Sequence, residues 1–152
     1  MNNDPLLRRR KAFLTFNGCV ALLIGTLAVS LPSTLIEQLK HADPSAAANV
    51  MARTVGVLIA AFGLLSLLVR SDPDSPTLRS VLLANLVLQL AIVPIDPLAY
   101  ECGTFRTLGS FLPNTVLHLV LIAGFGYFLE KMRKNSGAAR SAATSSHVAV
   151  PE

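Results

Sequence analysis

The sequence has few charged residues and lacks the short motifs that carry most enzymatic chemistry. Only 14% of its 152 residues are charged, whereas 52% are hydrophobic, and the mean hydropathy is +0.55. No HExxH, CxxC, GxSxG or phosphate-binding loop occurs, so no catalytic residue for hydrolase, disulfide-exchange or nucleotide chemistry is predicted. The chain is too apolar to leave a soluble domain beside its hydrophobic segments, and we expect one membrane domain.

Cysteine is also scarce. The two cysteines allow at most one internal disulfide. Cys19 lies in the first apolar segment and Cys102 in a later polar loop, so we expect different depths and no bond between them. We interpret Cys19 as a packing residue. Neither cysteine predicts a metal site.

Charge is absent from four long stretches of the chain. No Asp, Glu, Lys or Arg occurs in residues 12–36, 54–69, 80–95 and 107–129. A helix needs about 20 residues to cross a hydrocarbon core about 30 Å thick. We therefore predict an all-α integral membrane protein, an antiparallel four-helix transmembrane bundle. Its spans are expected at about 12–31, 51–70, 78–96 and 111–130.

The basic residues predict the orientation in the bilayer. All Lys and Arg residues except Lys40, Arg53 and Arg106 lie before the first span, between the second and third, or after the fourth. The positive-inside rule then places both termini in the cytoplasm, and we expect the inner membrane of a bacterium. This topology accounts for the net charge of +4, so the lipid bilayer is the expected partner and nucleic acid is not.

Two polar segments flank the expected membrane domain, residues 12–134. Residues 1–11 form a basic cytoplasmic arm, and the Ser- and Ala-rich residues 135–152 predict a disordered cytoplasmic tail. Between the first two spans, apolar residues at helical spacing predict a short helix on the outer surface. Two prolines, Pro94 and Pro97, close or bend the third span.

Polar side chains inside the spans are the candidate functional residues, because they are costly in hydrocarbon. On the third span, Asn85, Gln89 and Asp96 share one helical face, and on the fourth, Asn114 and His118 are one turn apart. Their depths predict a polar pocket that opens outward. The candidate ligand-binding residues are Arg53, Gln89, Asp96, Asn114 and His118.

Structural interpretations of these residues remain open. Arg53 and Asp96 are also expected to form an ion pair that closes the outer end of the bundle. His118 is either a structural hydrogen-bond donor or a contact for a proton, a quinone or a haem. The sequence names no cofactor.

Two further groups of residues predict helix packing. Asn17, Ser66 and Asn85 fall at similar depths near the inner face, which predicts an inner polar layer of hydrogen bonds between helices. Small residues recur on one face of the second span, where another helix is expected to approach closely. These small residues are Gly56, Ala60 and Gly63.

The chain resembles the small four-span bacterial membrane proteins grouped around DoxX. The resemblance rests on length, on four spans with both ends inside, and on two segments, Arg53-Thr54-Val55-Gly56 and Pro113-Asn114-Thr115-Val116-Leu117-His118. It covers about residues 12–130. It implies an accessory role near respiratory or redox membrane complexes and no catalytic residue.

Three functions stay open at this point. The first is a non-enzymatic accessory or assembly subunit that forms a homo-oligomer or joins a larger membrane complex through small-residue faces. The second is binding of a lipophilic small molecule, such as a quinone, in the outer pocket. The third is ion or proton transport by an oligomer, because four spans rarely enclose a pathway alone.

Overall fold

The residues that the structure describes form helices and loops, without a strand. A computed structural model places residues 5–105 and 107–147, with the backbone alone for 136–147. The elements are α1 (Pro5–Ser30), α2 (Pro32–Lys40), α3 (Ala46–Val69), α4 (Pro76–Ile92), α5 (Ile95–Glu101), the 3-10 turn η1 (Leu108–Ser110) and α6 (Leu112–His147). Four segments are long and apolar enough to cross a membrane: α1, α3, α4 with α5, and α6 to Asn135. The described residues therefore confirm the prediction of an all-helical chain with four apolar segments long enough to span a membrane.

Short polar and proline signals determine where the helices begin. The side chains of Ser45 and Ser75 accept hydrogen bonds from the backbone N–H of the residue three positions on, which caps α3 and α4. Pro76 follows in the first turn of α4, where its missing N–H costs no bond. The short helix expected between the first two spans is present as α2, and it ends at His41 with a left-handed φ of 48°.

Several helices differ in extent from the sequence prediction. The third span bends at Val93 and Pro94 and continues as α5. α1 begins at Pro5, inside the predicted basic arm. α6 continues to His147, where disorder was expected from residue 135. The remaining ends of the predicted arm and tail, residues 1–4 and 148–152, lie outside the described residues.

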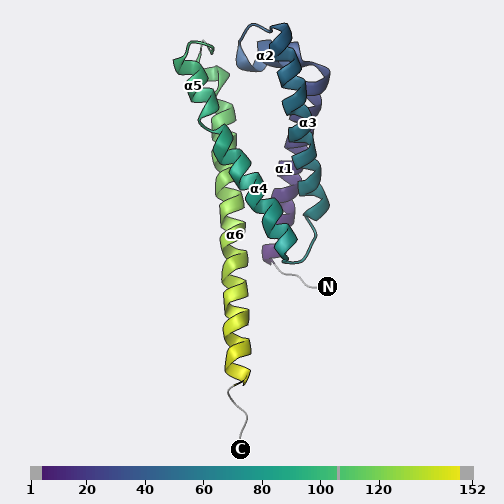
Figure 1. Cartoon of the computed structure of the whole chain (residues 1–152), viewed down its shortest axis with the longest axis vertical. Helices are drawn as coiled ribbons and strands as arrows, with labels where there is room; N and C mark the ends of the chain where they lie inside the picture. The colour runs from purple at the N-terminus through teal and green to yellow at the C-terminus, as the bar shows by residue number, and fades with distance from the viewer. Residues whose placement is uncertain (1–4, 106, 148–152) are drawn as a thin grey trace, which may run out of the picture.

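The long helices form two pairs that meet at one end (Figure 1). α1 packs along α3, and α4 crosses from the α3–α4 loop to pack against α6. We call the end with the α3–α4 loop the closed end. The opposite end, with α2, α5 and η1, is the open end, because the two pairs separate there.

The hydrophobic core joins α1, α3, α4 and α6 toward the closed end. On α1, the Phe13 ring lies edge-on to Phe125 of α6, with 5.0 Å between their centroids, a favourable aromatic geometry. The buried core residues are Leu14, Val69, Leu78, Leu82, Leu121, Phe125, Phe128 and Met132. This packing fixes the two helix pairs relative to each other.

Glycines let α1 and α3 approach closely. A Cβ atom added at Gly25 would lie 2.6 Å from the Gly56 carbonyl oxygen and 2.8 Å from the Ala60 backbone nitrogen. One added at Gly63 would lie 2.8 Å from the Ala21 Cβ. The small residues that the sequence singled out on the second span therefore face α1 of the same chain.

Two arginines connect neighbouring elements at the closed end. Arg10 is only 3% exposed; it forms an ion pair with Asp74 and donates a hydrogen bond of 2.5 Å to the Asp72 carbonyl oxygen. Arg79 donates to the Met132 carbonyl oxygen at 3.0 Å. These contacts attach α1 to the α3–α4 loop, and α4 to α6.

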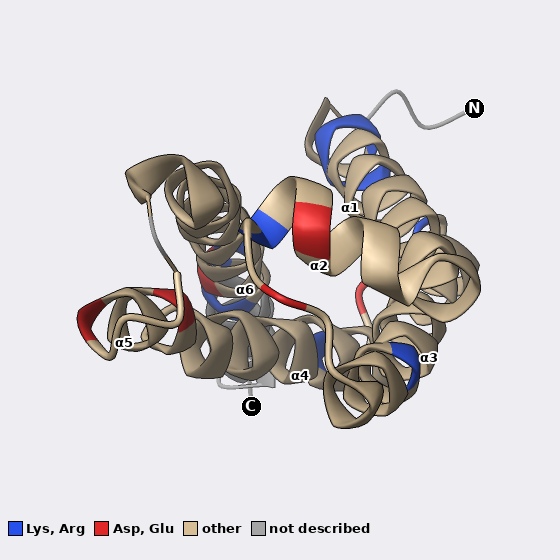
Figure 2. Ribbon diagram, turned by 90° about the horizontal axis from the view of Figure 1, so that it is seen from above, with Lys and Arg blue, Asp and Glu red and all other residues tan. Residues whose placement is uncertain are grey.

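Apolar side chains cover the outside of the long helices. Met51, Leu58 and Leu68 on α3 and Leu23 on α1 are all more than half exposed. Viewed from above, charged residues occupy only short segments of the ribbon, including parts of α2 and α5 (Figure 2). Water-soluble monomers rarely expose apolar surface on this scale, whereas lipid contact requires it.

Candidate functional site

Polar side chains from three elements meet at the open end. Asp96, in the first turn of α5, is buried, and its Oδ2 atom accepts hydrogen bonds from Lys40 Nζ at 2.5 Å and from Asn114 Nδ2 at 2.7 Å. The Lys40 ammonium also lies 5.1 Å from the centre of the Phe105 ring. Lys40, Asp96 and Asn114, which we call the polar cluster, join α2 to α5 and α6 where the helix pairs separate.

A second polar contact lies one turn further along α6. The Gln89 side-chain oxygen and His118 Nδ1 are hydrogen-bonded, and Gln89 is buried. This bond joins α4 to α6. Four of the five candidate ligand-binding residues thus fall into two hydrogen-bonded groups, one containing Asp96 and Asn114 and the other Gln89 and His118.

The fifth candidate, Arg53, is exposed on α3 and belongs to neither group. Among the described residues, the ion pair of Asp96 is formed with Lys40 and not with Arg53. The reason is the separation of the helix pairs: α3 packs on α1, whereas α5 follows α4, and α2 lies between them. Sequence reasoning missed Lys40 because no helical spacing connects it to Asp96. The available signal was a basic residue in the last turn of the expected surface helix.

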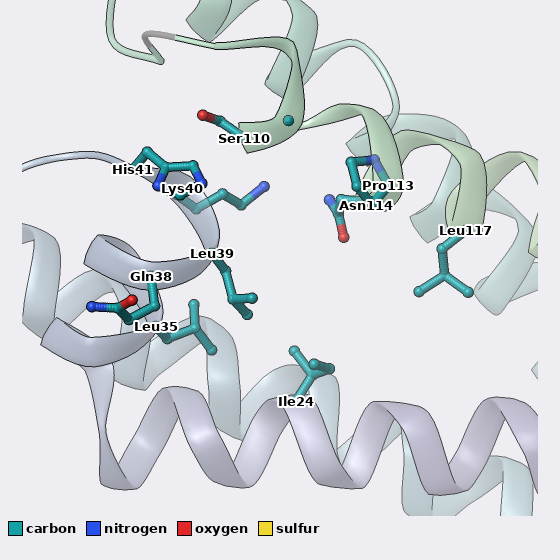
Figure 3. A pocket seen from close by; sticks show the side chains of 11 residues that line it. Ile24, Leu35, Gln38, Leu39, Lys40, His41, Ser110, Pro113, Asn114 and Leu117 are labelled. Carbon is teal, nitrogen blue, oxygen red and sulfur yellow. The ribbon is translucent and has the colours of Figure 1, made fainter.

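A cavity of about 330 Å³ adjoins the polar cluster (Figure 3). Ile24 projects from α1 toward Leu39 of α2, and the Lys40 side chain extends from α2 toward Asn114 of α6. Apolar side chains form most of the lining, and the polar groups come from α2, η1 and the first turn of α6. The cavity is lined by Ile24, Leu35, Gln38, Leu39, Lys40, His41, Gly109, Ser110, Pro113, Asn114 and Leu117.

A smaller, apolar cavity of about 210 Å³ lies along α2. It shares Leu35, Gln38 and Leu39 with the first cavity and reaches Leu27 and Leu31 near the end of α1. Leu39 itself is 53% exposed. The apolar side of α2 is therefore incompletely covered by the rest of the chain.

The residues of the expected inner polar layer are divided between the two helix pairs. Asn17 Nδ2 donates to Ser66 Oγ at 3.0 Å, which joins α1 to α3. Asn85 is buried on α4, and its amide donates to the Val81 carbonyl oxygen of its own helix at 2.9 Å. The structure thus brings Asn17 and Ser66 together and leaves Asn85 in the other pair.

Within the described part of the chain, no group of three or more His, Cys, Asp or Glu residues lies close enough to hold a metal ion. Cys19 and Cys102 are both free and exposed. Comparison with protein-family models, curated proteins and solved structures gives no match. The resemblance to DoxX-like proteins therefore stays a prediction, and function has to be inferred from the residues themselves.

Proposed function

We propose that this protein is a non-enzymatic integral membrane protein that holds a lipophilic small molecule in the cavity at its open end. The observation that carries the proposal is the cavity itself, about 330 Å³ in volume, with apolar walls and a few polar groups. Small-molecule sites typically have volumes of about 300–1,000 Å³ and this kind of lining. The polar cluster beside the cavity supplies fixed hydrogen-bonding groups.

In the membrane, we propose an antiparallel bundle with both termini in the cytoplasm and the open end at the outer face. The glycine contacts support opposite directions for α1 and α3, because Gly25 faces Gly56 whereas Gly18 faces Gly63. The basic residues near the closed end support its cytoplasmic location. The inner membrane of a bacterium fits this topology.

An accessory or assembly role is less well supported. The small-residue face on α3 that motivated it is covered by α1 of the same chain. The apolar residues exposed elsewhere suit lipid as well as they suit a protein partner. The redox connection implied by the DoxX-like resemblance enters this proposal only as one candidate ligand, a quinone.

Transport of ions or protons by an oligomer has no specific support. A pathway would use the polar residues of the spans, but Gln89 bonds His118, and Asp96 bonds Lys40 and Asn114. These bonds satisfy the groups that would have to bind a moving ion.

The test compares two neighbouring substitutions on α1. Ile24→Phe fills the cavity, whereas Leu23→Phe adds the same ring at a side chain that is 61% exposed. Both variants and the wild type are purified from their native membrane in mild detergent and examined by native mass spectrometry. We expect a small-molecule adduct on the wild type and on Leu23→Phe, and its loss from Ile24→Phe. Equal adducts on the two variants would refute the cavity as the site.

A further inference from the structure

We infer that the ligand of this cavity is a single-chain amphiphile with an anionic head group, a carboxylate or a phosphate. The inference rests on the proposed function, because it specifies the chemistry of the molecule that occupies the same site. It follows from three features: the positive charge on the polar side, the geometry of Lys40, and the apolar side chains along α2.

The polar side of the cavity contains a cation. Lys40 carries a positive charge, and Gln38 and His41 beside it can also donate hydrogen bonds. Asn114 and Ser110 contribute less, because the Asn114 amide donates to Asp96 and the Ser110 hydroxyl bonds Thr107. Among the described residues, no carboxylate lines the cavity. Such a lining complements a head group that accepts hydrogen bonds and carries negative charge, and charge-assisted bonds of this kind are roughly twice as strong as neutral ones.

Lys40 is positioned to bind an anion from the cavity. Its ammonium group has three N–H donors, and Asp96 is the described carboxylate that accepts from it. The side chain is 23% exposed and points across the cavity toward Asn114 (Figure 3). Asp96 itself does not line the cavity; it holds Lys40 and Asn114 through one shared oxygen. The remaining donors of Lys40 can therefore meet a second anion without displacing Asp96.

The apolar space favours a hydrocarbon chain over a compact ring. Three different helices supply Ile24, Leu35 and Leu117 to the walls of the larger cavity. The smaller cavity shares Leu35 and Leu39 with the larger one and reaches Leu31. An extended chain with its head group at Lys40 can lie along these apolar side chains of α2, whereas a planar quinone head would contact only the larger cavity.

The experiment measures binding of dodecanoate, dodecyl phosphate and dodecanol to the full chain in phosphatidylcholine nanodiscs. These probes share one hydrocarbon chain and differ in the charge of the head group. The key variant is Lys40→Met, with Lys40→Arg as the variant that keeps the charge. Arg53→Met is the matched control, because it removes a cation that lies outside the cavity.

We expect Lys40→Met to weaken binding of dodecanoate and dodecyl phosphate about tenfold or more, which corresponds to one charge-assisted hydrogen bond. Dodecanol binding should change less than about twofold, Lys40→Arg should restore most of the anion affinity, and Arg53→Met should have no effect. A stronger response to carboxylate or to phosphate identifies the source of the head group as a free fatty acid or as a lipid phosphate.

Two negative results separate this inference from the proposed function. If Ile24→Phe abolishes binding of all three probes but Lys40→Met weakens dodecanol as much as dodecanoate, the cavity binds amphiphiles and the anionic head group is refuted. A neutral quinone that binds more tightly than dodecanoate also refutes it. If Ile24→Phe changes none of the affinities, the cavity is not the site and the proposed function fails.

Discussion

Replacing Gly25 with alanine should destabilise the protein far more than the same change at Gly126, where the added atom meets open space. The added Cβ would lie 2.6 Å from the Gly56 carbonyl oxygen, and ordinary contact begins at 3.4 Å, so the helices must separate by 0.8 Å. The obstacle is backbone, which cannot rotate away as a flexible side chain can. Separation of the helices also weakens the Asn17–Ser66 hydrogen bond, which is 3.0 Å long and joins the same two helices.

The expected cost follows from these two losses. Overpacking of a tight contact costs about 1–3 kcal/mol, and an interhelical hydrogen bond in a membrane protein contributes about 0.6 kcal/mol. Gly126→Ala is the control, because a Cβ there meets nothing within 4 Å. Both variants gain the same helix propensity, about 1 kcal/mol. Gly25→Ala should therefore be about 2–4 kcal/mol less stable than Gly126→Ala.

The assay is unfolding in mixed micelles with increasing dodecyl sulfate, followed by far-UV circular dichroism because the chain has no tryptophan. If the contact is intrachain, the difference between the variants stays the same when the protein concentration is changed. A Gly25→Ala variant that unfolds within about 0.5 kcal/mol of Gly126→Ala would refute the close contact, since surface substitutions stay in that range. A difference that depends on protein concentration would instead show that this face packs against a second copy.

Three other perturbations test the closed end, the inner hydrogen bond and the topology. Arg10→Met should lower the free energy of unfolding in the same assay by about 1–3 kcal/mol, because the Asp74 carboxylate is then unpaired, although it is partly solvated. The control Arg9→Met, at an exposed position, should change the free energy of unfolding by less than about 0.5 kcal/mol. Ser66→Ala should cost about 0.6 kcal/mol, and a cost above about 2 kcal/mol would contradict a single interhelical bond. In intact cells, a membrane-impermeant maleimide should label Cys102 and not Cys19, and labelling of Cys102 only after lysis would reverse the proposed orientation.

The positions of the helices were largely predictable from the sequence, because each depends on local information. Charge-free stretches of sufficient length predicted the four apolar spans, and the start of α4 at Ser75 and Pro76 depends on local signals of the same kind. The end of α6 was not predictable in this way. Composition predicted disorder after residue 134, but helix propagation from the preceding turns carries α6 to His147.

The site was only partly predictable, because helical spacing relates residues on one helix and not on different helices. It grouped Gln89 with Asp96, and Asn114 with His118, and each of these residues bonds a member of the other group. It also grouped Arg53 with the pocket by depth alone. Depth gives no information on which side of the bundle a residue lies, and this is why Arg53 was included and Lys40 was missed.

The unequal packing of the two ends explains why a cavity forms where it does. At the closed end, Phe13 and the Arg10 contacts hold both helix pairs together. The glycine contacts continue along α1 to Gly25, so α1 stays close to α3 toward the open end. The space left between the pairs is crossed by α2, which is attached to the second pair through Lys40. A substitution that weakens the Lys40–Asp96 ion pair should therefore leave the packing of the closed end intact, whereas one that weakens the closed end should alter the packing at both ends.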